Sequence, residues 1–160
     1  MIEGRERRIV VGIDGSTESL AALRWALREA AATDSSVEVV HCWHPHAVTD
    51  VLFGSPEELH RGSVCMLRNE VTAALAEMSG RKPDVLESSR RGRPGPVLLE
   101  RTTVARLLVL GAHGRTELRD LAHGQVVSTC LKHASCPVVV VGGDESVLHH
   151  TGRPLTSSLA

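Results

Sequence analysis

The sequence predicts an α/β fold in which a five-stranded parallel sheet carries helices on both faces. Short runs of β-branched and other apolar residues, each of strand length, occur five times along the 160 residues. Segments whose apolar residues recur at helical spacing separate these runs. Strands that alternate with helices build βαβ units, whose crossovers make the strands parallel and place the helices on the faces of the sheet. The expected architecture is a Rossmann-like open sandwich.

Each element can be placed along the chain. The first strand is expected at residues 8–14, where RIVVGID is a buried apolar run that ends in Gly-x-Asp. Ser16 or Thr17 then offers an N-cap for a helix over about 17–32. Further strands are expected at 37–43, 85–89, 106–111 and 138–141, and further helices at about 57–79, 94–103 and 123–134.

The domain organisation is expected to be simple. A chain of 160 residues fits one domain, and it contains neither an internal repeat nor an interior linker. We expect a flexible N-terminus over residues 1–7, a single domain over 8–143 and a polar, flexible tail over 144–160.

Composition and charge argue against several classes of partner. The formal net charge is −1 and aromatic residues make up 2% of the chain, whereas nucleic-acid binders usually show a basic excess and stacking rings. No apolar run approaches the ~20 residues of a membrane helix. Residues 1–8 are charged and lack the apolar core of a signal peptide. We therefore expect a cytoplasmic protein that binds neither nucleic acid nor membrane.

The tract HCWHPH at 41–46 combines side chains that can ligate zinc or copper. His41 and Cys42 are adjacent on an expected strand, however, so their side chains point to opposite faces of the sheet. The four cysteines also show no CxxC pair. We therefore expect no metal site here, and buried apolar roles for the cysteines.

A glycine constellation is the strongest local signal of function. Gly111 and Gly114 directly follow the fourth expected strand, and Gly124 opens the next expected helix. Glycines after a strand let the backbone turn its amides toward anionic oxygens, and a helix N-terminus favours phosphate. The layout is that of a phosphate cradle. It is neither a P-loop nor the dinucleotide fingerprint GxGxxG, because both motifs are missing from the chain.

Several segments in the same order resemble the universal stress protein family. They are VVGIDGS at 10–16, LRWA at 23–26, VVHCW at 39–43, GRP at 92–94 with Leu98 and Leu99, LLVLGAHGR at 107–115 and LKHASCPV at 131–138. The resemblance implies a five-stranded parallel sheet and usually a dimer. It also implies that many members bind ATP through Gly-x2-Gly-x9-Gly-Ser/Thr, whereas a second group binds none.

The chain departs from that motif after its third glycine. Gln125 stands where the family has Ser or Thr, and Val127 stands where a second hydroxyl often follows. A hydroxyl is a compact donor to phosphate oxygens, whereas a glutamine amide is a longer donor that adds bulk. Arg106 also replaces the Asp common at the start of the fourth strand, which changes the surface charge.

The resemblance also implies a set of ligand-binding residues. Asp14 would lie under the adenine or ribose; as an alternative, it caps the first helix. The base pocket would be lined by Gly12, Ile13 and Cys42. The phosphates would be held by Gly111, His113, Gly114 and Arg115, with Gly124, Gln125 and Val126 closing the cradle. Arg115 is either a phosphate partner or a solvated loop residue. A divalent metal would enter only with the nucleotide.

Two functions follow from these observations. The first is a nucleotide-responsive binding module with weak ATP binding and a role in stress response. The alternative is a dimeric interaction protein of the same family with a degenerate pocket. We do not expect an enzyme, because the chain shows neither a GxSxG elbow nor a paired carboxylate at the expected strand ends.

The expected assembly is a homodimer that pairs through the fifth strand. Val138–Val141 is an apolar run near the end of the domain, so we expect it at a sheet edge. An open apolar edge invites pairing with a second copy of the chain.

Overall fold

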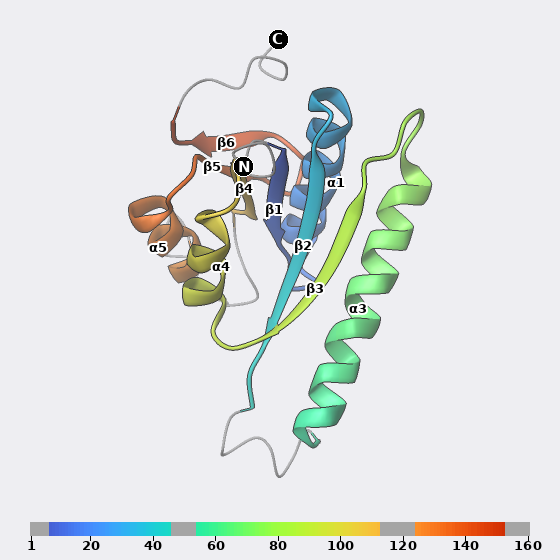
Figure 1. The fold of residues 1–160 in the computed structure, drawn as a ribbon, viewed down its shortest axis with the longest axis vertical. Helices are drawn as coiled ribbons and strands as arrows, with labels where there is room; N and C mark the ends of the chain where they lie inside the picture. Colours follow the sequence, from blue (N-terminus) through green and yellow to red (C-terminus); the bar gives the residue numbers. More distant parts are fainter. Residues whose placement is uncertain (1–6, 46–53, 113–123, 153–160) are drawn as a thin grey trace.

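The computed structural model describes residues 7–45, 54–112 and 124–152. Within them the chain alternates between strands and helices, as Figure 1 shows. The elements are β1 (Arg8–Gly12), α1 (Thr17–Thr33), β2 (Ser36–Trp43), α3 (Pro56–Glu77), β3 (Val85–Arg91), α4 (Pro94–Thr102), β4 (Leu107–Gly111), α5 (Gln125–His133), β5 (Val138–Val141) and β6 (Val147–His150). The α/β class expected from the sequence is confirmed.

The strands form one sheet in the order β3-β2-β1-β4-β5-β6. Strands β1 to β5 are parallel, and β6 runs antiparallel to β5. In β1, Ile9 lies opposite Val37 of β2 on one side and Leu107 of β4 on the other. The chain order therefore reverses at β1, which makes this strand the switch point of the sheet.

The helices cover the sheet from two sides, as expected. Ile9 and Val11 of β1 belong to the apolar core under α1 and α3, whereas Val10 belongs to the second core, under α4 and α5. All three side chains are fully buried. Burial on both faces explains why the parallel strands are continuous apolar runs rather than alternating patterns.

The helix starts follow ordinary capping chemistry. Ser16 is the N-cap of α1, where its Oγ accepts a hydrogen bond from the Ser19 amide at 3.2 Å. Ser55 and Glu58 form a reciprocal capping box at the start of α3, and Pro56 occupies the first turn. Within the residues that the structure describes, no helix is both long and apolar enough to cross a bilayer.

The C-terminal region differs from the expectation. Residues 147–150, expected to belong to a flexible tail, form β6 and pair with β5. The turn before β6 is held by the Gly142 amide, which donates to the Ser146 carbonyl at 2.8 Å. The sheet therefore has six strands rather than five. The expected N-terminal segment 1–7 and the last residues of the tail, 153–160, lie almost wholly outside the described residues.

The sixth strand also changes the position of β5. Val138–Val141 has β4 on one side and β6 on the other, and all four valines are buried. The expectation that β5 is an open edge is therefore wrong. The described edges of the sheet are β3 and β6.

Candidate functional site

A cleft opens at the carboxyl ends of β1 and β4, beside the switch point of the sheet. The described residues enclose a cavity of about 180 Å³ there. Its walls come from the β1–α1 turn, the ends of β2 and β4, and the first turns of α4 and α5. Ligands in open α/β sheets bind at this position.

Most of the residues expected at the site meet in this cleft. The lining includes Gly12, Ile13, Asp14, Cys42, Gly111, Gly124, Gln125 and Val126. The expected phosphate-facing residues His113, Gly114 and Arg115 lie outside the described residues. Seven further residues that were not expected at the site also line the cleft: Ser16, Ser19, Val40, Pro94, Leu98, Leu110 and Val127.

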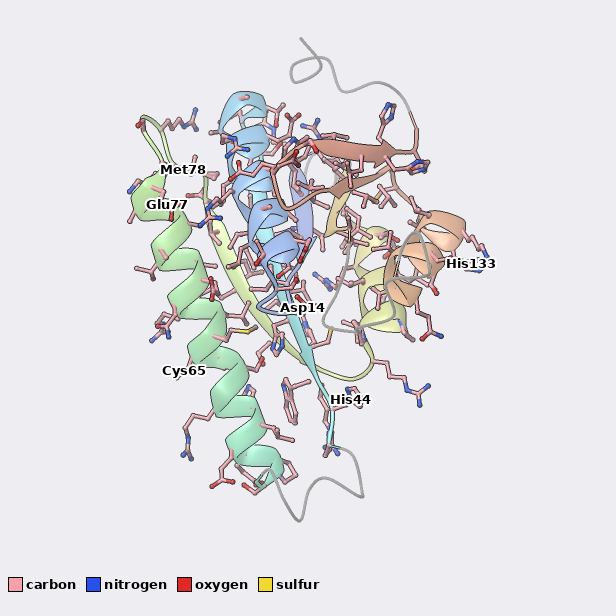
Figure 2. The ribbon with its side chains drawn as sticks, turned by 180° about the vertical axis from the view of Figure 1, so that it is seen from behind. Asp14, His44, Cys65, Glu77, Met78 and His133 are labelled. Carbon is pink, nitrogen blue, oxygen red and sulfur yellow. The ribbon has the colours of Figure 1, made fainter. Side chains whose placement is uncertain are left out.

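Asp14 fixes the turn between β1 and α1 (Figure 2). Its Oδ1 accepts a hydrogen bond from the Ser16 amide at 2.9 Å, and its own amide donates to Ser19 Oγ at 3.2 Å. Gly15, between them, has a φ of +80°, which glycine adopts without strain. Ser16 rather than Asp14 is therefore the N-cap, and Asp14 holds the turn from the wall of the cleft.

Gly111 is needed for the packing of β4 against α1, in addition to its place in the glycine motif. A Cβ on this residue would lie 2.6 Å from the Glu18 carbonyl carbon and 2.7 Å from the Ser19 amide nitrogen. Both atoms belong to the backbone of the first turn of α1, which packs on the end of β4. The glycine at this position is therefore required by the close contact between α1 and β4.

The N-terminus of α5 forms one wall of the cleft. Gly124 is the N-cap of this helix, and Gln125 and Val126 of the first turn line the cavity. The first amides of a helix have no partner within the helix, and the helix dipole favours negative charge at this end. Gln125 is exposed, whereas Val127 is buried. Gln125 thus lines the cleft and is exposed to solvent.

Cys42 contributes an apolar wall rather than a reactive thiolate. Burial raises the pKa of its thiol to about 11, against a smaller opposing effect of the Arg90 charge. The neighbouring His41 faces the other side of the sheet, where its Nδ1 lies 2.8 Å from Ser63 Oγ. The expected opposite orientation of these two side chains is confirmed. Within the described part of the chain, no group of three or more His, Cys, Asp or Glu side chains is placed to hold a metal.

The cleft therefore combines an apolar wall with a turn that carries one carboxylate and a helix end that favours anions. This arrangement suits a ligand that carries both an apolar part and an anionic group.

Comparisons with known proteins agree with this architecture. A family model described as the Universal stress protein family matches residues 6–142. A universal stress protein of Mycolicibacterium smegmatis is 31% identical over 157 residues, covering 94% of this chain and 53% of the relative. One from Mycobacterium tuberculosis is 30% identical over 149 residues, covering 90% and 50%. The chain thus spans about half the length of the curated relatives that it matches.

Solved structures of universal stress proteins share the fold. The protein UspA from Lactobacillus plantarum superposes with a TM-score of 0.71 at 22% identity, covering 85% of this chain and 97% of that one. A universal stress protein in complex with cAMP has a TM-score of 0.66 at 23% identity, and the match covers 84% of this chain and 96% of that one. An Arabidopsis thaliana member with AMP bound has a TM-score of 0.53 at 19% identity, and the match covers 85% of this chain and 91% of that one. Since the family model spans most of the residues and curated relatives reach 30% identity, the chain belongs to the universal stress protein family.

Proposed function

We propose that this chain is a nucleotide-responsive binding module of the stress response, which takes ATP weakly in the cleft between β1, β4 and α5. Binding of the nucleotide would shift a conformational or partner equilibrium, because ATP would interact differently with its two states. A divalent metal would enter as a companion of the nucleotide. The proposal assigns binding to the cleft, without hydrolysis.

The observation that carries the proposal is the position of the N-terminus of α5. Gly124, Gln125 and Val126 line the same cavity as Asp14 and Cys42. An anionic group and a base bound in one cleft would therefore have suitable partners at its two ends. Related structures with cAMP and AMP support an adenine nucleotide as the ligand class.

The affinity is expected to be low because of Gln125. A hydrogen bond to a charged group contributes about 1.5–3 kcal/mol, and a neutral one about 0.5–1.5 kcal/mol. Loss of one compact hydroxyl donor would weaken ATP binding by roughly tenfold to a hundredfold. The backbone amides of the first turn would still bind phosphate, because the first amides of a helix have no partner within the helix.

Titration calorimetry with ATP and Mg²⁺ tests the proposal on three proteins. Gln125→Ser restores a compact donor and should tighten binding by about tenfold or more. Gln125→Glu should abolish binding, because its charge repels phosphate, although an acidic residue in the first turn favours the helix itself. Lys132→Gln, in the last turn of α5, is the control and should leave the affinity unchanged.

The alternative function predicts a different result. If the parent protein shows no binding at millimolar ATP and Gln125→Ser does not restore it, the cleft is not a nucleotide site. The chain would then be an interaction protein with a degenerate pocket.

A further inference from the structure

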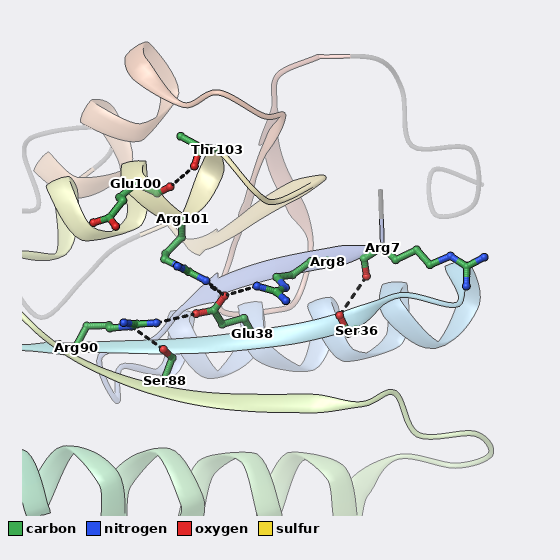
Figure 3. A network of polar contacts seen from close by, with 9 residues as sticks. All are labelled: Arg7, Arg8, Ser36, Glu38, Ser88, Arg90, Glu100, Arg101 and Thr103. Carbon is green, nitrogen blue, oxygen red and sulfur yellow. Dashed lines mark hydrogen bonds and ion pairs between the residues drawn. The ribbon is translucent and has the colours of Figure 1, made fainter. Parts of the chain in front are cut away.

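A buried carboxylate gathers three arginines on the α4 side of the sheet (Figure 3). The side chain of Glu38, on β2, is 1% exposed. Arg101 of α4 donates to its Oε2 through Nη2 at 2.8 Å and Nε at 3.3 Å. Arg8 of β1 lies 3.5 Å from the same oxygen, and Arg90 of β3 lies 3.8 Å from Oε1. We call Arg8, Arg90 and Arg101 the arginine cluster.

The cluster holds more positive charge than Glu38 requires. One carboxylate faces three guanidinium groups, which leaves a formal surplus of two positive charges. The whole chain has a formal net charge of −1, so this surplus is local. Arg106 is not counted in it, because its guanidinium donates to Ser35 Oγ at 3.0 Å. Arg101 supplies both of its hydrogen bonds to Oε2, whereas the buried Oε1 has no hydrogen-bond partner among the described residues and faces Arg90 at 3.8 Å.

Two arginines of the cluster have donors to spare. Arg90 uses its Nε–H on Ser88 Oγ at 2.8 Å, and its Nη2 is too far from Glu38 for a hydrogen bond. Arg8 contributes its ion pair, with no side-chain hydrogen bond to any described residue. The Arg8 side chain is 35% exposed and the Arg90 side chain is 46% exposed. Both guanidinium groups can therefore be reached from solvent.

We propose that the arginine cluster is a second anion site, which binds a phosphoryl dianion. Guanidinium forks match the geometry of phosphate oxygens and form charge-assisted hydrogen bonds to them. A charge of −2 would balance the formal surplus. Glu38 orients the Arg101 fork through its two hydrogen bonds and attracts Arg8 and Arg90 as ion-pair partners.

The cluster is separate from the cleft, since none of its three members lines that cavity. The two nevertheless adjoin, because Arg90 lies opposite Cys42 of the cleft wall in the β2–β3 pairing. The proposal is independent of nucleotide binding, so the failure of one leaves the other intact.

The direct test is NMR of the arginine Nε–H groups in the ¹⁵N-labelled protein, titrated with inorganic phosphate. Sodium chloride at matched ionic strength is the control for screening. We expect saturable shifts at Arg8, Arg90 and Arg101 in the millimolar range. Phenyl phosphate, a phosphomonoester, should bind as well as inorganic phosphate if the site accepts phosphoryl groups carried by larger molecules. Binding of inorganic phosphate alone would restrict the site to the free ion.

Variants then assign the binding to the cluster. Arg90→Gln should weaken phosphate binding by about tenfold or more. Arg68→Gln is the matched control, because Arg68 is 72% exposed and pairs with Glu87 elsewhere on the surface. Equal affinity in Arg90→Gln and the parent, or no saturation at tens of millimolar phosphate, would overturn the proposal.

Glu38→Gln gives a test of opposite sign. Loss of the carboxylate frees Arg101 and removes a repulsive charge, so phosphate should bind more tightly and raise the melting temperature more than in the parent protein. A merely structural network predicts no extra effect of phosphate in this variant, and that result would contradict an anion site. If Glu38→Gln fails to fold, the Arg90→Gln titration alone decides the question.

Discussion

Replacement of Gly111 by alanine should destabilise the fold, whether or not a nucleotide binds. The added Cβ would lie 2.6 Å from the Glu18 carbonyl carbon, 2.7 Å from the Ser19 nitrogen and 2.8 Å from the Glu18 oxygen. These atoms are backbone, so no side-chain rotation can relieve the clash. Either the first turn of α1 or the end of β4 must move, and both positions line the cleft.

The expected cost can be bounded. Overpacking a tight interior typically costs about 1–3 kcal/mol. For a domain of this size, each kcal/mol lowers the melting temperature by about 2–4 °C. Gly111→Ala should therefore lower the melting temperature by about 2–12 °C.

Urea unfolding followed by circular dichroism measures this cost against a matched control. Gly62 is exposed within α3, and a Cβ there would meet nothing within 4 Å. Gly62→Ala should raise the free energy of unfolding by about 0.5–1 kcal/mol, because glycine is unfavourable inside a helix. If Gly111→Ala unfolds at the urea midpoint of the parent while Gly62→Ala is stabilised, the packing argument is wrong.

Three further predictions concern capping, pH and assembly. Ser55→Ala breaks the capping box of α3 and should lower the free energy of unfolding by about 0.5–2 kcal/mol in urea, whereas Ser55→Asp should retain most of it. Burial raises the pKa of Cys42 and Cys130 to about 11. The contribution of these thiols to the free energy of unfolding should therefore be constant below pH 9 and decrease as the pH rises from 9 through about 11. The unfolded chain releases thiol protons that the folded chain retains, and urea unfolding of a double alanine variant should show a shallower fall. Truncation after Gly143 removes β6 and uncovers Val138–Val141, so light scattering should give a larger mass than for the full chain; equal masses would contradict pairing through β5.

Local patterns sufficed to predict the parallel part of the sheet. Val138–Val141 coincides with β5, and the helical spacing after Ser16 predicts α1 to within a residue at its end. These elements are buried on one or both faces, so the spacing of their apolar residues in the sequence indicates both the element and its buried side. β6 was missed because VLHH has no apolar alternation, and its conformation depends on the pairing of Val147–His150 with β5.

The part of the cleft that was predicted comprises the strand ends and the start of α5, where Gly124, Gln125 and Val126 lie. Gly12, Asp14 and Cys42 were expected from the family resemblance, and they meet in the cleft because parallel strands deliver their carboxyl ends to one edge. Pro94 and Leu98 were missed because they come from α4, whose position over the sheet depends on tertiary packing. The arginine cluster was missed for the same reason, since its members come from three different elements.

The pairing of β1 with β4 has a consequence for synthesis on the ribosome. The β2 edge of β1 can pair early, because β2 follows soon after α1. The opposite edge must wait for β4, since Ile9 pairs with Leu107. At the usual rates of translation, the about one hundred intervening residues take roughly 5 to 20 seconds to emerge. During that interval a nascent chain presents the apolar edge Ile9–Val11 without its partner, which makes this strand the segment that a chaperone would need to shield.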